Sequence, residues 1–372
     1  MVSRKCFRPF LKGQEGLPFR VILSYTIINS LMQIDRKTIK NILVVRNDRF
    51  GEFLLNIPAL RALKETFSDA RLIVVVDPYT KELAESVLFI DEIIEWGRQR
   101  HSLSEKLRLI KLLRKKSIDM AIMLNPSKDF NIITRFAGIP IRVGYDRKWG
   151  FLLTHKIKDR KHLGGKHEIE YNLELASLVG AKTKDRTVSI SIDDTIADDL
   201  LKDAGIENND NLVALHPWTS DPIKQWPLQN FFELAKRLIR EQDMRVIIIG
   251  GKDELAKSIE LFPPQNVADS PRIMANNNID SNLINLTART TLTQLAALLK
   301  KCKVLISGDS GPVHLACAVG AKVLAIFRND IPGKSARRWG PWGEGHIVIE
   351  KANLSDITVD EVFGKLKEAL NR

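Results

Sequence analysis

The chain alternates between short hydrophobic runs rich in β-branched residues and longer segments in which apolar residues recur at helical spacing. In the first half the hydrophobic runs cover 41–46, 71–76, 118–124 and 141–144, and the helical patterns cover 53–67, 79–88, 102–116 and 166–179. Strands that alternate with helices in this way form a mostly parallel sheet covered on both faces. This half therefore predicts a doubly wound α/β domain.

The second half repeats the pattern. Its predicted strands are 211–215, 244–249, 302–306 and 322–327, and its predicted helices are 228–241, 252–261, 291–301 and 311–319. A polar, acidic stretch at 183–200 is the expected crossover between the halves. We predict two Rossmann-like domains, 39–185 and 186–350, that face each other across a cleft. The remaining segment, 351–372, contains a helical pattern at 357–371 that we expect to pack near the hinge.

Residues 1–38 form a separate N-terminal extension. Basic residues precede an amphipathic pattern in "VILSYTIINSLM", which is too short to span a bilayer and is followed by no small-residue cleavage site. Two interpretations stay open: the helix lies in a membrane interface, or it covers part of the domain surface.

The amino-acid composition gives the chain a net positive charge. The 372 residues include 57 Lys and Arg against 45 Asp and Glu, a net charge of +12, which implies an anionic partner. Nucleic acid is disfavoured, because the basic residues are scattered along solvent faces of predicted helices instead of clustering with aromatic side chains. Three cysteines without metal-ligand spacing fit a reducing, cytoplasmic compartment.

Two loops of the second half have the chemistry of a diphosphate site. In "SGDSGPVHLACAVG" a strand is followed by Asp309, Ser310 and Gly311, and His314 lies in the first turn of the next helix, whose free amides and dipole attract anions. In "HPWTSDPIKQWP" a long loop carries Thr219, Ser220 and Lys224 as donors for phosphate oxygens. Simple helix capping, and a loop pinned by its two tryptophans, are the alternative explanations.

Two further loops follow strands of the same predicted sheet. Glu254 follows "VIIIGG" and either receives ribose hydroxyls or complements a helix dipole, and Thr287 ends a short apolar run. Because all four loops follow strand C-termini, we expect them to converge on one edge of the sheet.

The first half has its own polar junction, "RNDRFGE", where Arg46, Asp48, Arg49 and Glu52 follow a buried strand. The motifs "RNDRFGE…NIPALRALK", "RVGYDRKWGFLLTH", "HPWTSDPIKQWP", "LTARTTLTQLAALL" and "SGDSGPVHLACAVG" resemble the ADP-heptose:lipopolysaccharide heptosyltransferase family, glycosyltransferase family nine, over residues 40 to 350. The resemblance implies a GT-B architecture and an inverting glycosyltransferase.

The resemblance also implies roles for these residues. Thr219, Ser220, Lys224, Asp309, Ser310, Gly311 and His314 would hold the donor diphosphate, and Glu254 and Thr287 would bind the adenosine. The family commonly has Gly-Asp where this chain has Gly51-Glu52, so Glu52 is the expected base and Asp48 the runner-up. Arg46, Arg49 and Arg61 would face the acceptor. No metal is expected, because Lys224 and helix amides can take up the leaving-group charge.

The implied partners are an ADP-heptose donor and a lipid-linked anionic glycan acceptor, at a cytoplasmic location with peripheral contact to the anionic inner membrane. Two alternatives remain: a GT-B transferase that uses another nucleotide sugar for capsule or another surface glycan, and a relative that binds nucleotide without catalysing transfer.

Overall fold

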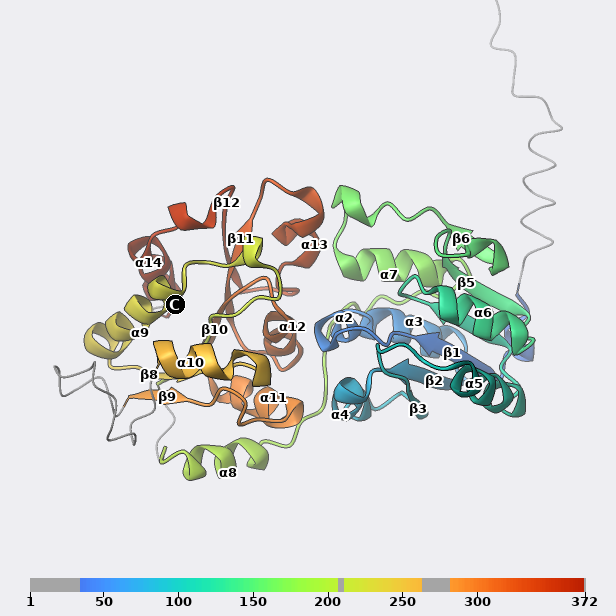
Figure 1. Ribbon diagram of the computed structural model, residues 1–372, viewed down its shortest axis with the longest axis horizontal. Helices are drawn as coiled ribbons and strands as arrows, with labels where there is room; N and C mark the ends of the chain where they lie inside the picture. The colour runs from blue at the N-terminus through green and yellow to red at the C-terminus, as the bar shows by residue number, and fades with distance from the viewer. Residues whose placement is uncertain (1–33, 207–210, 263–281, 371–372) are drawn as a thin grey trace, which may run out of the picture. The chain divides into compact units, whose positions relative to one another are not determined.

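Two parallel sheets organise the chain (Figure 1). The computed structural model describes residues 34–206, 211–262 and 282–370, so most of the predicted N-terminal extension lies outside the described residues. From Lys37 onward, the described residues belong to one compact unit.

The first sheet has six parallel strands in the order β3-β2-β1-β4-β5-β6. Their bounds are β1 Asn41–Val45, β2 Arg71–Val76, β3 Glu92–Glu95, β4 Met120–Met123, β5 Ile141–Tyr145 and β6 His155–Ile157. All four predicted strands of this half are present. The short edge strands β3 and β6 were missed, because runs of three or four half-buried residues carry little hydrophobic pattern.

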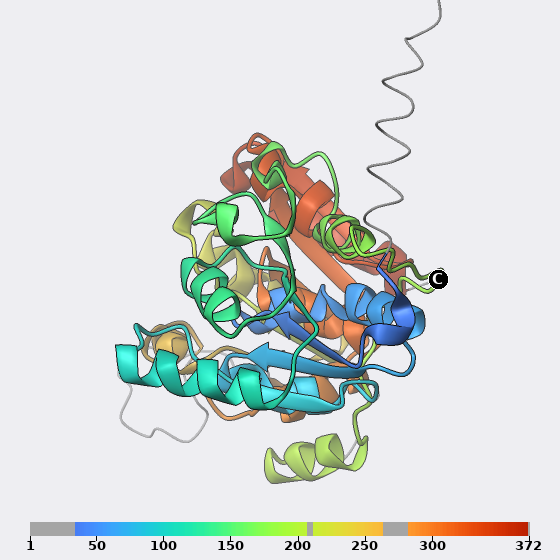
Figure 2. The ribbon, with the colours of Figure 1, turned by 90° about the vertical axis from the view of Figure 1, so that its right-hand side faces the viewer.

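Helices cover both faces of this sheet. They are α2 Phe50–Leu54, α3 Ile57–Thr66, α4 Lys81–Glu85, α5 Leu103–Lys115, α6 Lys128–Phe136 and α7 Glu168–Ser177. Leu109 and Leu113 of α5 and Phe130 of α6 share one apolar core with Leu43 and Ile73 of the strands. Two views show α5 running beside the strands (Figure 1, Figure 2). The helices α3 and α7 pack against each other.

The second sheet repeats the topology of the first. Its order, β12-β11-β10-β7-β8-β9, is the same Rossmann order when read from the other edge, which confirms the predicted α/β architecture. The strands are β7 Leu212–His216, β8 Arg245–Ile248, β9 Leu283–Asn285, β10 Val304–Gly308, β11 Val323–Arg328 and β12 Ile347–Lys351. The helices are α8 Thr195–Asp203, α9 Leu228–Gln242, α10 Leu255–Leu261, α11 Leu292–Lys301, α12 Gly311–Ala318, α13 Ala336–Trp339 and α14 Val359–Leu370.

The predicted helix 53–67 is two helices, which changes the position of the candidate base. The first, α2, begins at Phe50 and ends at Leu54, and α3 starts at Ile57 with Pro58 in its first turn. Glu52 therefore lies in the first turn of α2 and not in an open loop. The expected continuous helix was wrong because a proline near the start of a helix cannot continue the hydrogen bonding of the preceding turn.

The C-terminal helix belongs to the second sheet. Val362, Phe363 and Leu366 of α14 lie in one apolar core with Leu234 and Leu238 of α9. The carbonyl of Ile357, just before α14, accepts a hydrogen bond from Trp226 Nε1 at 2.9 Å. These contacts of α14 lie within the second half of the chain, and its packing near the hinge stays a prediction.

Candidate functional site

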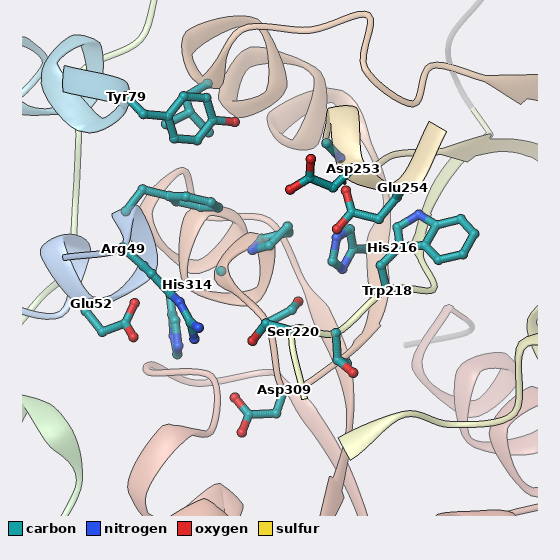
Figure 3. A pocket seen from close by; sticks show the side chains of 18 of the residues that line it. Arg49, Glu52, Tyr79, His216, Trp218, Ser220, Asp253, Glu254, Asp309 and His314 are labelled. Atoms are coloured by element: carbon teal, nitrogen blue, oxygen red, sulfur yellow. Dashed lines mark hydrogen bonds between the residues drawn. The ribbon is translucent and has the colours of Figure 1, made fainter. Parts of the chain in front are cut away.

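A pocket of about 720 Å³ lies where loops from the C-terminal edges of both sheets meet. This volume is in the range of small-molecule binding sites. Residues after β1, β2 and β3 line it from the first half, and residues after β7, β8, β9, β10 and β11 line it from the second half. The predicted residues that line it are Asp48, Arg49, Glu52, Thr219, Ser220, Lys224, Glu254, Asp309, Ser310, Gly311 and His314 (Figure 3).

Two short glycine contacts bring the halves together at this pocket. A Cβ added to Gly51 in α2 would lie 2.9 Å from the Cα of Gly311, the first residue of α12, and 3.1 Å from Cδ2 of His314. A Cβ on Gly311 would collide with the ring of Phe50. Only glycine allows this approach, so the first turn of α2, with Glu52, is held against the N-terminus of α12.

The two diphosphate loops expected from the sequence do meet. Lys224, at the end of a short 3₁₀ turn after β7, places its Nζ 2.5 Å from Oδ2 of Asp309, which follows β10. Burial raises the pKa of Asp309, while the neighbouring Lys224 opposes that shift. Both side chains line the pocket, so an ammonium group lies beside the amino end of an eight-residue helix. This combination of charge and helix dipole attracts anions.

Two buried histidines border the same region as neutral groups. His314 in α12 and His216 at the end of β7 each have a pKa lowered by burial to about 3. Nδ1 of His216 lies 3.0 Å from Oγ of Ser307, and the Ser307 hydroxyl lies 2.8 Å from that of Ser310. Nδ1 of His314 is buried without a hydrogen-bond partner. A neutral imidazole with a vacant nitrogen is suited to hydrogen bonding with a bound ligand.

The Glu52 carboxylate lies in an environment that favours its protonated form. Burial raises its pKa and the nearby charge of Asp48 raises it further, while Arg46 and Arg49 oppose the shift. Asp48 itself is held by Arg46, whose Nε lies 2.7 Å from Oδ1. A carboxylate with a raised pKa in a pocket is suited to proton transfer. Asp48 is paired with Arg46, so Glu52 stays the first candidate for a base and Asp48 the second.

A buried ionic cluster supports this junction from behind. Glu168, whose side chain is only 1% exposed, lies 3.7 Å from Arg46 Nη1 and 3.0 Å from Arg338 Nη2. Lys161 pairs with the same carboxylate. Burial alone would raise the pKa of Glu168, but these three cations lower it below its ordinary value. Because Arg338 lies in α13 of the second half and also lines the pocket, the cluster ties both halves to the site.

The opposite end of the pocket has a different character. It is lined by Gly250, Gly251 and Glu254 after β8, together with Trp218 and the segment from Ala288 to Leu292. Oε2 of Glu254 accepts a hydrogen bond from the Gly251 amide at 2.7 Å, so this carboxylate already caps its own turn. The site thus has a charged end, where Lys224 meets Asp309 beside α12, and a second end, where the loop after β8 brings Lys252, Asp253 and Glu254 beside the 288–292 segment.

Three predicted residues do not line the pocket. Thr287 is buried behind its wall, with its hydroxyl 2.7 Å from that of Ser258. Arg46 is buried in the ionic cluster. Arg61 in α3 donates to the carbonyls of Asp185 and Thr187, and so holds the crossover against the first half. For Arg61 the geometry gives a structural role instead of the expected contact with an acceptor.

Other pocket residues were missed by sequence reasoning. Asp77 and His216 could have been predicted from the sequence, because each directly follows a predicted strand, 71–76 and 211–215. Arg338 and Trp339 carried no such signal, since they belong to the short α13 between β11 and β12, which no periodic pattern marks. In the described part of the chain, no group of three or more His, Cys, Asp or Glu side chains is arranged to hold a metal ion.

Comparison with known proteins connects this fold and site to one family. The sequence profile "Glycosyltransferase family 9 (heptosyltransferase)" matches residues 106–362. A "Putative glycosyltransferase" of Haemophilus influenzae is 25% identical over 346 residues, which cover 88% of this chain and 96% of that protein. "Lipopolysaccharide heptosyltransferase 2" of Salmonella typhimurium is 24% identical, covering 78% of this chain and 83% of its own.

The fold is shared with solved structures as well. "Structure of E. coli ADP-heptose lps heptosyltransferase II" superposes with a TM-score of 0.75 at 21% identity, covering 89% of this chain and 98% of the other. The profile match extends over more than half of the chain and includes the Lys224 and Asp309 loops. The chain therefore belongs to glycosyltransferase family 9, the heptosyltransferase family.

Proposed function

We propose that this protein transfers a heptosyl group from ADP-heptose to a hydroxyl of an inner-core lipopolysaccharide acceptor. One observation carries the proposal: the Lys224–Asp309 pair beside the amino end of α12 and the carboxylate of Glu52 border the same pocket. The names of the Salmonella and Escherichia coli relatives support the choice of donor and acceptor.

The diphosphate of the donor would occupy the charged end. Lys224 would exchange part of its contact with Asp309 for phosphate oxygens, and Thr219, Ser220 and Ser310 would add neutral donors. His314 would donate one N–H from its neutral ring. These groups stabilise the negative charge that develops on the leaving nucleotide as the bond to the anomeric carbon breaks.

The adenosine would lie at the other end of the pocket. Glu254 lines this region with its free carboxylate oxygen available to the ribose, while Thr287 would act only through the wall behind Gly250. We therefore assign the nucleoside to the surface formed by Gly250, Glu254 and the 288–292 segment.

The acceptor hydroxyl would approach from the side of the first sheet. Glu52 would remove its proton as the oxygen attacks the anomeric carbon, in a single displacement that inverts the configuration. The guanidinium of Arg49 lines the pocket next to Glu52 and suits a carboxylate or phosphate on the acceptor. Arg338 offers a second guanidinium, already anchored on Glu168.

We infer that Lys224 and the dipole of α12 perform the charge neutralisation for which other transferases use a divalent cation. The expected result is full transfer after dialysis against a chelator. A turnover that falls with the chelator and returns with one added divalent ion would contradict this part of the proposal.

The function is tested by incubating the purified full-length protein with ADP-, UDP- and GDP-sugars and a lipid-linked core acceptor, with mass spectrometry of the acceptor. An added mass of one heptose only with ADP-heptose supports the proposal. A hexose from UDP- or GDP-sugar would favour a transferase for another glycan, and nucleotide binding without any transfer would favour a non-catalytic relative. The Lys224→Gln protein is the negative control.

We further propose a cytoplasmic enzyme in which residues 39–185 bind the acceptor, residues 186–350 bind the donor and residues 1–38 touch the anionic inner membrane. No helix in the described ranges is long and apolar enough to cross a bilayer. The membrane contact is tested by sedimentation with anionic vesicles for the full chain and for a variant without residues 1–38. Equal sedimentation of the two would remove the extension from this proposal.

A further inference from the structure

A carboxylate from the first half caps a helix of the second. Glu82, in α4, accepts a hydrogen bond from the amide of Leu292 at 2.7 Å, and from the hydroxyl and amide of Thr293 at 2.8 and 3.3 Å. Leu292 is the first residue of α11, so Glu82 binds a helix end that is 210 residues away in the sequence.

The remaining amides at this helix end are satisfied within α11. The hydroxyl of Thr291 accepts from the amide of Gln294 at 3.2 Å, and Oε1 of Gln294 accepts from the Thr291 amide at 2.9 Å. This capping box leaves the amides of Leu292 and Thr293, the first and second helical residues, without a partner in α11. Both amides donate to the carboxylate of Glu82. Glu82 thus completes a helix start whose residues Thr290, Thr291 and Leu292 line the pocket.

The same short segment brings an aromatic ring to the pocket. Tyr79 lies three residues before Glu82, and its ring lines the pocket while its side chain remains 56% exposed. The ring packs edge-on against Phe50 at a centroid distance of 6.3 Å. Figure 3 shows its hydroxyl pointing across the pocket toward the side of Asp253 and Glu254. A large aromatic ring left exposed at a ligand pocket is suited to a planar ligand group.

Resting on the proposed donor site, we propose that the first half supplies part of the nucleoside pocket: Tyr79 contacts the base of the bound nucleotide, and Glu82 is the positioning residue that holds Tyr79 and α11 at the correct separation. In this proposal the Tyr79 ring forms one wall of the nucleoside pocket, and the 288–292 segment, which lines the same pocket, forms another.

This arrangement explains why the cap is built from the other half of the chain. If a residue of α11 capped this helix, no hydrogen bond would link the amino end of α11 to the segment that carries Tyr79. With Glu82 as the cap, the amino end of α11 and the Tyr79 ring are joined through one turn of chain. A base between the walls then adds contacts to both halves, so nucleotide binding and the Glu82 contact favour each other.

Calorimetric titration with two probes tests the proposal without requiring transfer. ADP carries a base, whereas inorganic pyrophosphate reaches only the charged end. Tyr79→Ala is expected to weaken ADP binding on the order of tenfold, as for the loss of a base–aromatic contact. Glu82→Gln is expected to weaken it about two- to fivefold, as for the loss of a charge at a helix start. Pyrophosphate binding should be unchanged in both.

Conservative and matched variants separate contact from folding. Tyr79→Phe keeps the ring and should bind ADP as the wild type does. Glu85→Gln removes an exposed carboxylate from the same helix α4, and Phe151→Ala removes an exposed ring outside the pocket, and both should leave ADP binding unchanged. In transfer assays Tyr79→Ala should raise the KM for the donor more than it lowers kcat.

The results that would overturn the inference are distinct from those that would overturn the proposed function. If Tyr79→Ala binds ADP normally, or loses pyrophosphate binding to the same extent as ADP, Tyr79 is not a base-contacting residue. If Glu82→Gln behaves like Glu85→Gln, Glu82 has no positioning role. If the wild type binds UDP or GDP instead of ADP, the proposed donor is wrong, and the same ratios measured with that nucleotide decide the role of Tyr79.

Discussion

Gly51 in α2 and Gly311 in α12 lie so close that a Cβ on Gly51 would sit 2.9 Å from the Cα of Gly311. The contact joins the helix that carries the candidate base to the helix whose amino end borders the proposed diphosphate site. We expect Gly51→Ala to push the two helices apart and to destabilise the protein by about 1–3 kcal/mol, as overpacking of a tight contact does. Transfer should fall by more than this loss of stability explains, because Glu52 moves with α2.

Chemical denaturation and steady-state assays of this variant provide the measurement. Gly364→Ala is the matched control, since a Cβ there meets nothing within 4 Å and Gly364 lies in the exposed face of α14. That change should stabilise the protein by about 0.5–1 kcal/mol through helix propensity. Normal transfer by Gly51→Ala would show that the close approach is not needed for catalysis.

Glu52→Gln should abolish most transfer while stabilising the fold. Loss of a general base commonly costs about 10²–10⁴ in rate. Because the folded-state pKa of Glu52 is raised above the ordinary value, its contribution to stability is present below the unfolded pKa and is lost as the pH rises through the folded pKa. At neutral pH the buried charge therefore destabilises the protein, and its removal should raise the melting temperature.

The raised pKa of Glu52 also predicts how activity depends on pH in the acidic range. In the wild type, kcat/KM should rise with pH through a pKa above that of an ordinary glutamate, because the base must be deprotonated. Asp48→Asn serves as the comparison: it removes a neighbouring negative charge and should move this limb to lower pH. If the Glu52→Gln protein had wild-type turnover, another group would have to be the base.

Lys224 and Asp309 should be coupled in donor binding. Lys224→Gln removes the ammonium group from the charged end of the pocket, and we expect kcat/KM to fall about 10²–10³-fold, as for the loss of one preorganised donor. Asp309→Asn alone should cost less, because Lys224 remains. In the double variant the two losses should not add, since the residues share one contact at 2.5 Å. Strictly additive losses in this double-mutant cycle would mean that the two side chains act separately.

Removal of the Glu168 carboxylate should destabilise the protein strongly. Glu168→Gln would leave Arg46, Lys161 and Arg338 beside one another without their shared counter-charge, and breaking a buried ionic group of this kind costs about 3–5 kcal/mol. The control is Glu174→Gln on the same helix α7, whose exposed pair with Lys166 should contribute less than about 1 kcal/mol. Urea unfolding of the two variants compares them directly, and equal midpoints would contradict the structural role of the cluster.

The fold and the charged end of the site were predictable because local pattern determines them. β-branched runs placed the central strands of both sheets, and parallel strands bring their C-terminal loops to one edge, so Lys224, Asp309 and Glu52 could be expected near a common cleft. The edge strands and α13 escaped prediction because they are short and half-exposed. The break between α2 and α3 escaped because Ile57 and Pro58 continue the apolar spacing even though the helix stops.

What the sequence by itself determined was the order of strands and helices and the chemical types of group at each strand end. The tertiary structure decided which of these groups meet. Arg46 and Arg49 are three residues apart, yet one is buried against Glu168 and the other lines the pocket. Glu82 caps α11 from the other half of the chain. Such choices depend on burial and on contacts between distant segments, where the cost of an unpaired charge or amide is large, and no local pattern contains that information.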